Sequence, residues 1–261
     1  MSEPAVLIVA RADDAIACRL RSALENRGWR VEWLDGLGAA RRFTIRVGPE
    51  ATVVTPEMPI FVRPSAWWLN EAGSADERFL RAEAHAAFWA AAALSPAPVI
   101  NRPARNGIAP RMTAGTIAHA IGQIPANGAG ESHASGPEMF EGACEALWGE
   151  DIRYLTAPLS QLEKGVPLRA RKLNPEAQYE IVTVVGDLAF PATTDPRTPE
   201  LELPARSVAI AQRLGFYFVA VTWSISETES LPIRVNPAPD EYEVRYAWRE
   251  VSDALCEALL Q

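Results

Sequence analysis

The sequence of 261 residues is poor in lysine, cysteine and histidine, and each shortage narrows the chemistry open to it. Only Lys164 and Lys172 among the 25 basic residues are lysines, so a lysine-dependent mechanism has two candidates. The three cysteines are odd in number, widely spaced and form no CxxC pair, which excludes a full disulfide framework and argues against zinc. We therefore expect a reducing, cytoplasmic environment.

Long apolar runs and an excess of positive charge are also missing. The run at residues 5–10 is short and ends at Arg11, so it predicts neither a signal peptide nor a membrane span. The formal net charge of −8 and the pI of about 5.1 disfavour nonspecific electrostatic binding to nucleic-acid phosphates or anionic lipids. We expect no nucleic-acid and no membrane partner, although a local basic cleft is compatible with this charge.

The common catalytic signatures are absent as well. The sequence has no GxSxG, HExxH or P-loop string, and no GxGxxG follows the first predicted strand. Hydride transfer and P-loop chemistry are therefore poorly supported. The histidines lie far apart, two on predicted helices and one in a predicted loop, and are interpreted as surface or core-edge residues. They are His85, His119 and His133.

The first hundred residues alternate strand and helix signals, which indicates an α/β domain. The run at 5–10 is rich in β-branched residues and predicts a strand buried on both faces. After it, Asp13 and Asp14 suit the positive end of a helix that Gly28 ends. Further strands are predicted at 29–34, 43–47, 52–54, 60–62 and 99–101.

A long helix is predicted at 76–94, with an apolar stripe facing the core. Regular structure ends before it at Arg63-Pro64, because proline lacks an N–H and restricts the preceding residue. We place a domain boundary after residue 102. The residues of the predicted stripe are Phe79, Ala82, Ala86, Trp89 or Ala90, and Ala93.

Beyond this boundary the pattern changes to hairpins. A short helix is predicted at 113–122, and the capping-box string that begins at Ser135 predicts another at 137–147. Gly186-Asp187 suits a tight turn between two strands. Strands are predicted at 152–156, 166–172, 179–185, 188–190, 216–223 and 232–235, and helices at 204–214 and 244–260. We expect an α/β domain joined to an α+β domain.

Five strings, in order along most of the chain, resemble one known family. In the first half they are Arg63-Pro64 and Asn101-Arg102-Pro103, with a predicted helix that bears Glu83 between them. In the second half they are YEIVTVVGDLAF, LGFYFVAVTW and IRVNPAP. The family is the ATP-grasp superfamily, especially ligases related to glutathione synthetases, ribosomal-protein glutamate ligases and graspetide maturases.

The resemblance implies a fold and a division of the chain. The expected fold is α/β plus α+β and ATP-grasp-like, with an N-terminal βαβ pre-ATP-grasp domain, a short lid module and an antiparallel-sheet C-terminal domain. The implied boundaries are 1–102 for the pre-ATP-grasp-like domain, 103–172 for the central or lid module, and 173–261 for the ATP-grasp-like core.

The resemblance also implies ATP and Mg²⁺ as cofactors. In this family two lysines hold ATP, while a carboxylate on one strand and a Glu-x-Asn string on the next hold magnesium. Here Thr222 and Arg234 stand at the carboxylate positions, and only Asn236 remains as a weak metal ligand. Because Arg234 and Asn236 are two apart on one predicted strand, we expect both side chains to point, with that of Thr222, into the same cleft. Arg111 lies near the first lysine position, and the second has no clear counterpart. Acids that could have taken over the metal are Glu180, Asp187 and Asp195.

Arg234 replaces a negative charge by a positive one, which would repel Mg²⁺ at that position. An arginine could instead contact phosphate directly, or bind a carboxylate ligand through two parallel hydrogen bonds. The alternative is that Arg234 pairs with a neighbouring acid and does nothing else. The neighbouring acids are Asp240, Glu241 and Glu243.

A second basic group lies in the predicted strand at 166–172. Strand alternation puts Arg169 and Arg171 on one face and Lys172 on the other. We expect an anionic ligand on the arginine face, in a cleft between the two halves that Asn236 also lines. The alternative is a solvated edge strand that its charges protect against pairing.

Two functions are compatible with these residues. The first is an ATP-dependent carboxylate–amine ligase for a peptide or small acid, which activates a carboxylate as an acyl phosphate. The second is a catalytically impaired ATP-grasp-like binding protein that recognises an anionic ligand or peptide without turnover, or acts as the partner of an active ligase. A receiver domain is suggested by Asp13-Asp14, but no later Asp and Lys complete its acidic pocket.

Overall fold

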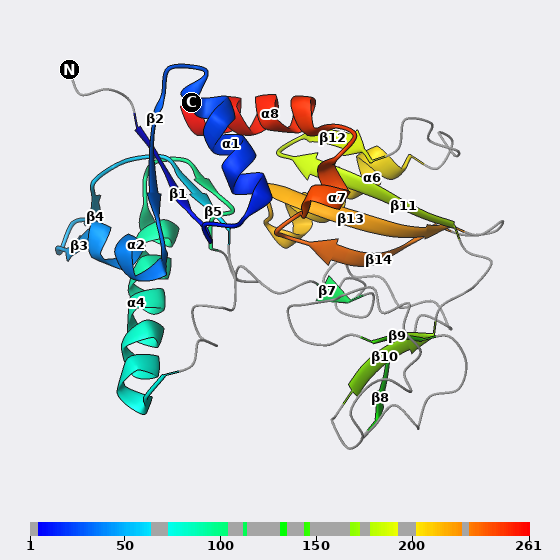
Figure 1. Cartoon of the computed structure of the whole chain (residues 1–261), viewed down its shortest axis with the longest axis horizontal. Helices are drawn as coiled ribbons and strands as arrows, with labels where there is room; N and C mark the ends of the chain where they lie inside the picture. Colours follow the sequence, from blue (N-terminus) through cyan, green and yellow to red (C-terminus); the bar gives the residue numbers. More distant parts are fainter. Residues whose placement is uncertain are drawn as a thin grey trace.

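The protein is built around two sheets, which the computed structural model places side by side (Figure 1). The first is parallel, with strand order β2-β1-β5-β6, and the second is antiparallel, with order β12-β11-β13-β14-β7. The predicted α/β domain followed by an antiparallel-sheet domain is therefore confirmed. The structure describes residues 5–63, 73–103, 178–192, 202–225 and 230–261, and the backbone of four strands at 112–113, 131–134, 144–146 and 168–172.

Helices cover both faces of the parallel sheet. Side chains alternate along β1, so Val6 and Ile8 pack toward α1 while Leu7 and Val9 pack toward α2 and α4. A separate hairpin joins β3 to β4. The elements are β1 (Ala5–Val9), α1 (Ala15–Glu25), β2 (Arg30–Leu34), α2 (Gly36–Arg42), β3 (Thr44–Val47), β4 (Thr52–Thr55), β5 (Ile60–Val62), α4 (Ala75–Leu94) and β6 (Val99–Ile100).

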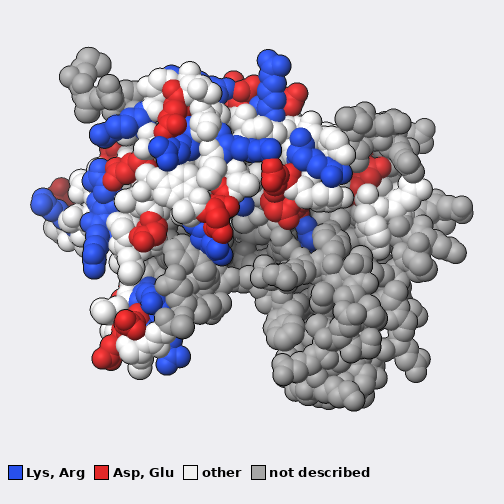
Figure 2. All heavy atoms as spheres, viewed as in Figure 1, with Lys and Arg blue, Asp and Glu red and all other residues white. Residues whose placement is uncertain are grey.

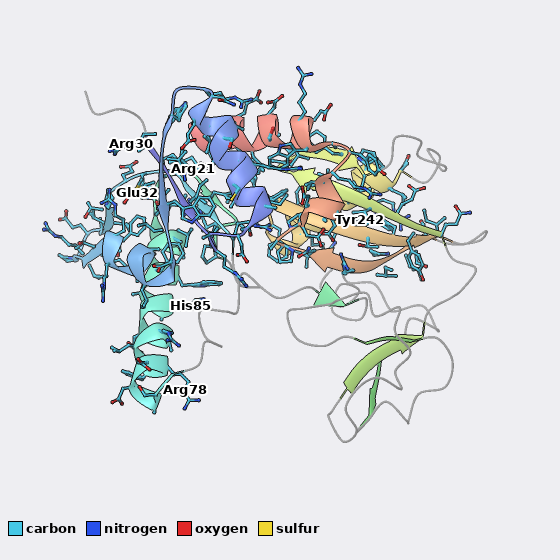
Figure 3. The ribbon with its side chains drawn as sticks, viewed as in Figure 1. Arg21, Arg30, Glu32, Arg78, His85 and Tyr242 are labelled. Atoms are coloured by element: carbon cyan, nitrogen blue, oxygen red, sulfur yellow. The ribbon has the colours of Figure 1, made fainter. Side chains whose placement is uncertain are left out.

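The predicted apolar stripe of α4 is wrong. Phe79 is 64% exposed, and the helix buries Phe88, Ala91 and Ala92 instead. The reason is that the first half of α4 extends beyond the sheet, where Figure 3 shows Arg78 and His85 along it. Alanine is compatible with either face, so the spacing of the many alanines did not identify the turns that meet the sheet.

His85 gives α4 a pH-dependent contribution to stability. It is half-buried against Trp89, with 4.9 Å between the ring centroids, and burial lowers its pKa below the ordinary value of 6.5. Because the unfolded chain binds the proton more readily, this contribution is present above pH 6.5 and is lost as the pH falls through the folded-state pKa. We expect the urea midpoint of the wild type to fall more steeply than that of His85→Gln between about pH 7 and about pH 5. Parallel curves for the two proteins would contradict this assignment.

The antiparallel sheet carries α6 on one face and α7 and α8 on the other. Val182, Val184 and Val221 point toward α6, which ends at Gly215 in the left-handed region at φ 76°. The predicted tight turn at Gly186-Asp187 is confirmed. The elements are β7 (Met112–Thr113), β11 (Gln178–Val185), β12 (Leu188–Pro191), α6 (Leu203–Leu214), β13 (Phe218–Ile225), β14 (Ser230–Asn236), α7 (Glu241–Val244) and α8 (Trp248–Leu260).

The two sheets share one helical layer. Helix α8 packs against α1, and Val251, Leu255 and Leu259 join the cluster that contains Leu20 and Leu24 of α1. Val185, the last residue of β11, and Phe218, the first residue of β13, belong to the same cluster. No helix in the described ranges has the length and apolar character that a membrane crossing requires.

A small antiparallel sheet with order β8-β10-β9 stands apart from the other two (Figure 1). Its strands are β8 (Glu131–Ala134), β9 (Cys144–Ala146) and β10 (Leu168–Lys172). The helix predicted at 137–147 is therefore wrong at 144–146, because pairing with β10 outweighs a local capping signal. His133 lies in β8 and not in a loop. The helix predicted at 113–122 is wrong at Thr113, which lies in β7. The rest of that helix and the strand predicted at 152–156 lie outside the described residues.

Candidate ligand site at the junction of the sheets

Three of the residues predicted for the site share one face of the antiparallel sheet. Thr222 of β13 lies opposite Arg234 of β14, and Asn236 follows two residues later. Residues two apart on a strand share a face, so this arrangement confirms that Arg234 and Asn236 lie on one face of the sheet, together with Thr222. That this face lines a cleft stays a prediction. Their exposed fractions are 2%, 4% and 2%, so all three are buried.

Glu243 of α7 is the residue that organises this face. Its carboxylate forms an ion pair with Arg234 and accepts hydrogen bonds from Asn236 Nδ2 at 2.5 Å and from the Asp240 backbone N–H at 2.9 Å. Its backbone oxygen accepts a bond from Thr183 Oγ1 at 2.9 Å. The pairing of Arg234 with a neighbouring acid, considered from the sequence, is confirmed for Glu243. We call Arg234, Asn236 and Glu243 the Glu243 network.

The sequence around Glu243 explains how it reaches this position. Asp240 caps α7, accepting a bond from the Glu243 backbone N–H at 3.0 Å, while the Glu243 side chain returns to the Asp240 N–H. This is a capping box, which the Asp-x-x-Glu spacing signals in the sequence. The helix start therefore directs a carboxylate at Arg234.

The described residues do not fit a magnesium site at this place. Thr222 offers an uncharged hydroxyl, Arg234 a cation, and the carboxylate of Glu243 is already bonded through both oxygens. Among the residues the structure describes, no group of three or more His, Cys, Asp or Glu side chains could hold a metal ion. Hard divalent cations need free carboxylate or carbonyl oxygens, which this set lacks.

Two of the acids proposed as replacement metal ligands are misplaced. Glu180 shares a strand face with Val182 and Val184, and those two pack toward α6, opposite the Glu243 network. Asp187 lies in the β11–β12 turn and accepts a bond from Gln212 of α6 at 2.8 Å. Both replacements are therefore wrong. Asp195 lies outside the described residues.

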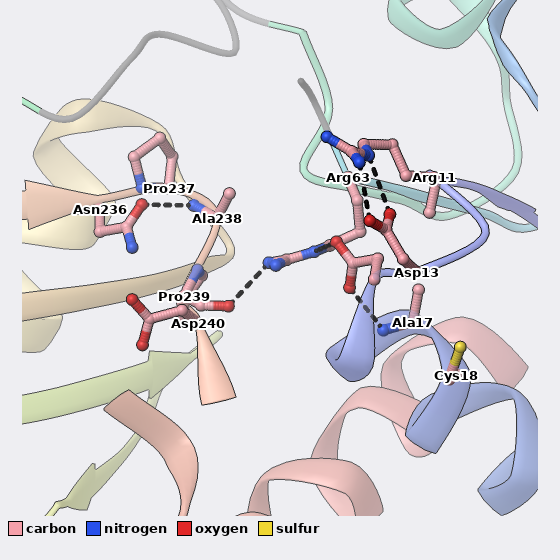
Figure 4. A network of polar contacts seen from close by, with 12 residues as sticks. Arg11, Asp13, Ala17, Cys18, Arg63, Asn236, Pro237, Ala238, Pro239 and Asp240 are labelled. Atoms are coloured by element: carbon pink, nitrogen blue, oxygen red, sulfur yellow. Dashed lines mark hydrogen bonds and ion pairs between the residues drawn. The ribbon is translucent and has the colours of Figure 1, made fainter. Parts of the chain in front are cut away.

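Arg63 joins the site to the carboxyl end of the parallel sheet (Figure 4). Its Nε donates to Asp14 Oδ2 at 2.9 Å, and its Nη1 donates to the backbone oxygen of Pro239 at 2.9 Å. Asp14 also caps α1 through the Ala17 N–H at 2.8 Å. The loop from β14 to α7 thus lies against the strand ends where α/β sheets bind ligands.

Asn101 makes the second connection between the sheets. It is 2% exposed and comes directly after β6. Its Nδ2 donates to the oxygens of Phe218 and Pro237, both at 2.7 Å. Its Oδ1 accepts from the N–H groups of Tyr217 at 2.9 Å and Phe218 at 2.7 Å. All four hydrogen-bonding positions of the amide are used, so Asn101 is a bridge between domains.

The other predicted site residues are only partly located. Arg169, Arg171 and Lys172 lie in β10, and Arg171 stands opposite Glu131 and Glu145 in the strand register. Because β10 is the central strand of its sheet, the edge-strand alternative is wrong. Arg111 lies outside the described residues. Whether these cations line the same site as Asn236 stays a prediction.

No protein-family model and no curated protein matches the sequence. Solved structures do match. The macrocyclase MdnB from Microcystis aeruginosa MRC superposes with a TM-score of 0.67 at 16% identity, over 98% of this chain and 99% of that chain. The ATP-grasp ligase PsnB, complexed with minimal precursor, Mg and ADP, gives 0.62 at 15% identity over 100% and 98%. The chain has an ATP-grasp-like fold.

A third structure extends this comparison. The macrocyclase MdnC from Microcystis aeruginosa MRC, bound with precursor peptide MdnA, gives a TM-score of 0.63 at 16% identity, over 98% of this chain and 99% of that chain. The ATP-grasp-like fold confirms what the five strings implied. Sequence reasoning placed Arg234 and Asn236 on one face, but it did not identify the bridging roles of Asn101 and Arg63. The groups that these two residues contact in the antiparallel-sheet domain lie 116 or more positions away in the chain.

Proposed function

We propose that this chain is an ATP-grasp-like protein that binds a peptide or another anionic ligand without magnesium-dependent turnover. The observation that carries the proposal is the Glu243 network, in which Arg234, at a strand position expected to hold the metal, is held in a buried ion pair with Glu243 of α7. The peptide is suggested by the solved structures of MdnC and PsnB, which contain precursor peptides. Arg111, Arg169 and Arg171 are the proposed contacts for the anion, and Lys172, on the other face of the same strand, is proposed to add positive charge to this site.

The proposed ligand site draws on all three of the segments that the sequence resemblance implies. We propose residues 1–102 and 173–261 as the two sides of the site and residues 103–172 as the module that supplies the basic strand β10. The hydrogen bonds of Asn101 and Arg63 join the described parts of the two sides. An anion is bound by arginine directly, because the guanidinium offers a fixed fork of donors to a carboxylate or phosphate. A protein of this kind could act beside an active ligase that performs the transfer.

Calorimetry with nucleotide tests the proposal. We expect little or no Mg²⁺-dependent ATP binding by the wild type, and at least a tenfold gain, about 1.4 kcal/mol, in the double variant Thr222→Asp, Arg234→Glu. The substitutions add two carboxylates beside Glu243, which creates a donor set for Mg²⁺. The same variant should melt at a lower temperature in EDTA than in Mg²⁺, because unneutralised carboxylates repel one another in a buried site.

The matched control is Thr222→Asn, Arg234→Gln, which alters the same positions without adding charge. It should show no difference between EDTA and Mg²⁺. Tight Mg²⁺·ATP binding by the wild-type protein would contradict the proposal and place the metal ligands in other residues.

A second candidate function is the ATP-dependent carboxylate–amine ligase. It is favoured by the match over nearly the whole chain to PsnB, a ligase whose structure contains Mg and ADP. Release of ADP in the presence of ATP, Mg²⁺ and a peptide or small acid would support this function over the first.

A further inference from the structure

The segment that follows the Glu243 network carries two exposed tyrosines around an arginine. Tyr242 of α7 and Tyr246 are each 54% exposed. The guanidinium carbon of Arg245 lies 4.4 Å from the centroid of the Tyr242 ring and 4.3 Å from that of Tyr246. Figure 3 shows Tyr242 at α7, in front of the antiparallel sheet. We call Tyr242, Arg245 and Tyr246 the tyrosine–arginine cluster.

Within the described residues, no carboxylate forms an ion pair with the arginine of this cluster. Figure 2 shows basic and acidic side chains interspersed over the described part of this face. Nearby Glu241 is paired with Arg19 at 2.6 Å. In contrast, neither Arg245 nor Arg249, four residues later, forms an ion pair in the described part of the chain. Both side chains are exposed.

The exposed tyrosine and arginine side chains of the cluster are better suited to binding a partner than to stabilising the fold. Exposed rings contribute little to the core, whereas tyrosine and arginine are enriched among the residues that dominate interface energies. Contact with two rings holds Arg245 in place, so less side-chain freedom is lost when a partner binds. A partner must therefore bring carboxylates for Arg245 and Arg249, and apolar groups for the two rings.

We propose that the tyrosine–arginine cluster and Arg249 form a docking surface for an acidic peptide segment of a partner, one in which glutamate or aspartate alternates with apolar residues. The surface lies outside the Glu243 network and requires neither nucleotide nor metal. Its failure would therefore leave the proposed function of the buried site untouched.

Fluorescence anisotropy of the full chain with a labelled Glu-Glu-Leu repeat peptide tests the surface. We expect binding that Arg245→Ala, Arg249→Ala weakens by about tenfold or more, and that Tyr242→Ala, Tyr246→Ala weakens to a similar degree. A Gln-Gln-Leu repeat of equal length should bind at least about tenfold more weakly than the acidic peptide. Unchanged thermal melting of the variants, whose substituted side chains are exposed, shows that the fold is retained.

The charge-matched control is Arg30→Ala, Arg78→Ala, which removes two exposed arginines from β2 and α4, distant from α7 in Figure 3. It should change the affinity by less than about twofold. An equal loss in this control would attribute binding to net charge and overturn the proposal. So would the absence of binding by the wild type, or equal affinity for the acidic and neutral peptides.

Discussion

Replacing Arg234 by methionine is expected to lower the free energy of unfolding by about 3–5 kcal/mol. The substitution leaves the Glu243 carboxylate buried without its counter-ion, and an unpaired buried charge is far more costly than a missing surface contact. Glu243→Gln should also be destabilising, because it leaves Arg234 as the uncompensated charge. Urea unfolding of both variants measures the two losses.

The double variant Arg234→Met, Glu243→Gln separates the ion pair from the general cost of altering the core. It should be clearly more stable than the sum of the single losses predicts, because no unpaired charge remains. The exposed pair Arg21 and Glu25 on α1, with 2.7 Å between Nε and Oε1, is the matched control, and its cycle should show far weaker coupling. Strictly additive losses at Arg234 and Glu243 would contradict a stabilising pair.

Asn101→Ala is expected to destabilise the protein by about 3 kcal/mol or more. The substitution removes the partner of two backbone N–H groups and two backbone oxygens that are buried at the junction of the sheets. Each group left without a partner costs about 1–3 kcal/mol unless water enters. Chemical unfolding, followed by the signals of tryptophans in both domains, measures the loss.

Asn101→Asp is the sharper version of this experiment. The carboxylate has nearly the same shape as the amide, but it places an acceptor opposite the oxygens of Phe218 and Pro237. We therefore expect a large loss of stability from a nearly isosteric change, and a larger loss at neutral pH than at acidic pH, where the carboxyl can donate. Asn26→Ala, at the exposed end of α1, is the control and should have little effect. A small effect of both Asn101 variants would refute the bridging role.

Local patterns in the sequence predicted those elements whose signals agree with tertiary packing. The apolar run at 5–10 forms the buried strand β1, and the glycines at 186 and 215 adopt the positive φ that their turns require. Strand alternation likewise placed Arg234 and Asn236 on one face. In each case the backbone preference and the burial of the side chains favour the same structure.

The wrong predictions concern segments where the local pattern does not determine the tertiary packing. Alanine in α4 is compatible with either burial or exposure, so its spacing could not identify the turns that reach the sheet. At 144–146 a local helix signal was outweighed by pairing with a strand more than twenty positions away. The role of Asn101 depends on groups more than one hundred positions away in the chain, and no local pattern contains that information.

The helical layer shared by α1 and α8 has a consequence for how the protein is made. The apolar face of α1 is buried partly by Val251, Leu255 and Leu259, which are translated more than two hundred residues later. During synthesis the parallel sheet can form early, but this side of it remains exposed until residues 248–260 have left the ribosome. A nascent chain paused before that point therefore presents a hydrophobic surface to chaperones. When α8 forms, it buries apolar side chains of α1 and of the antiparallel sheet at the same time.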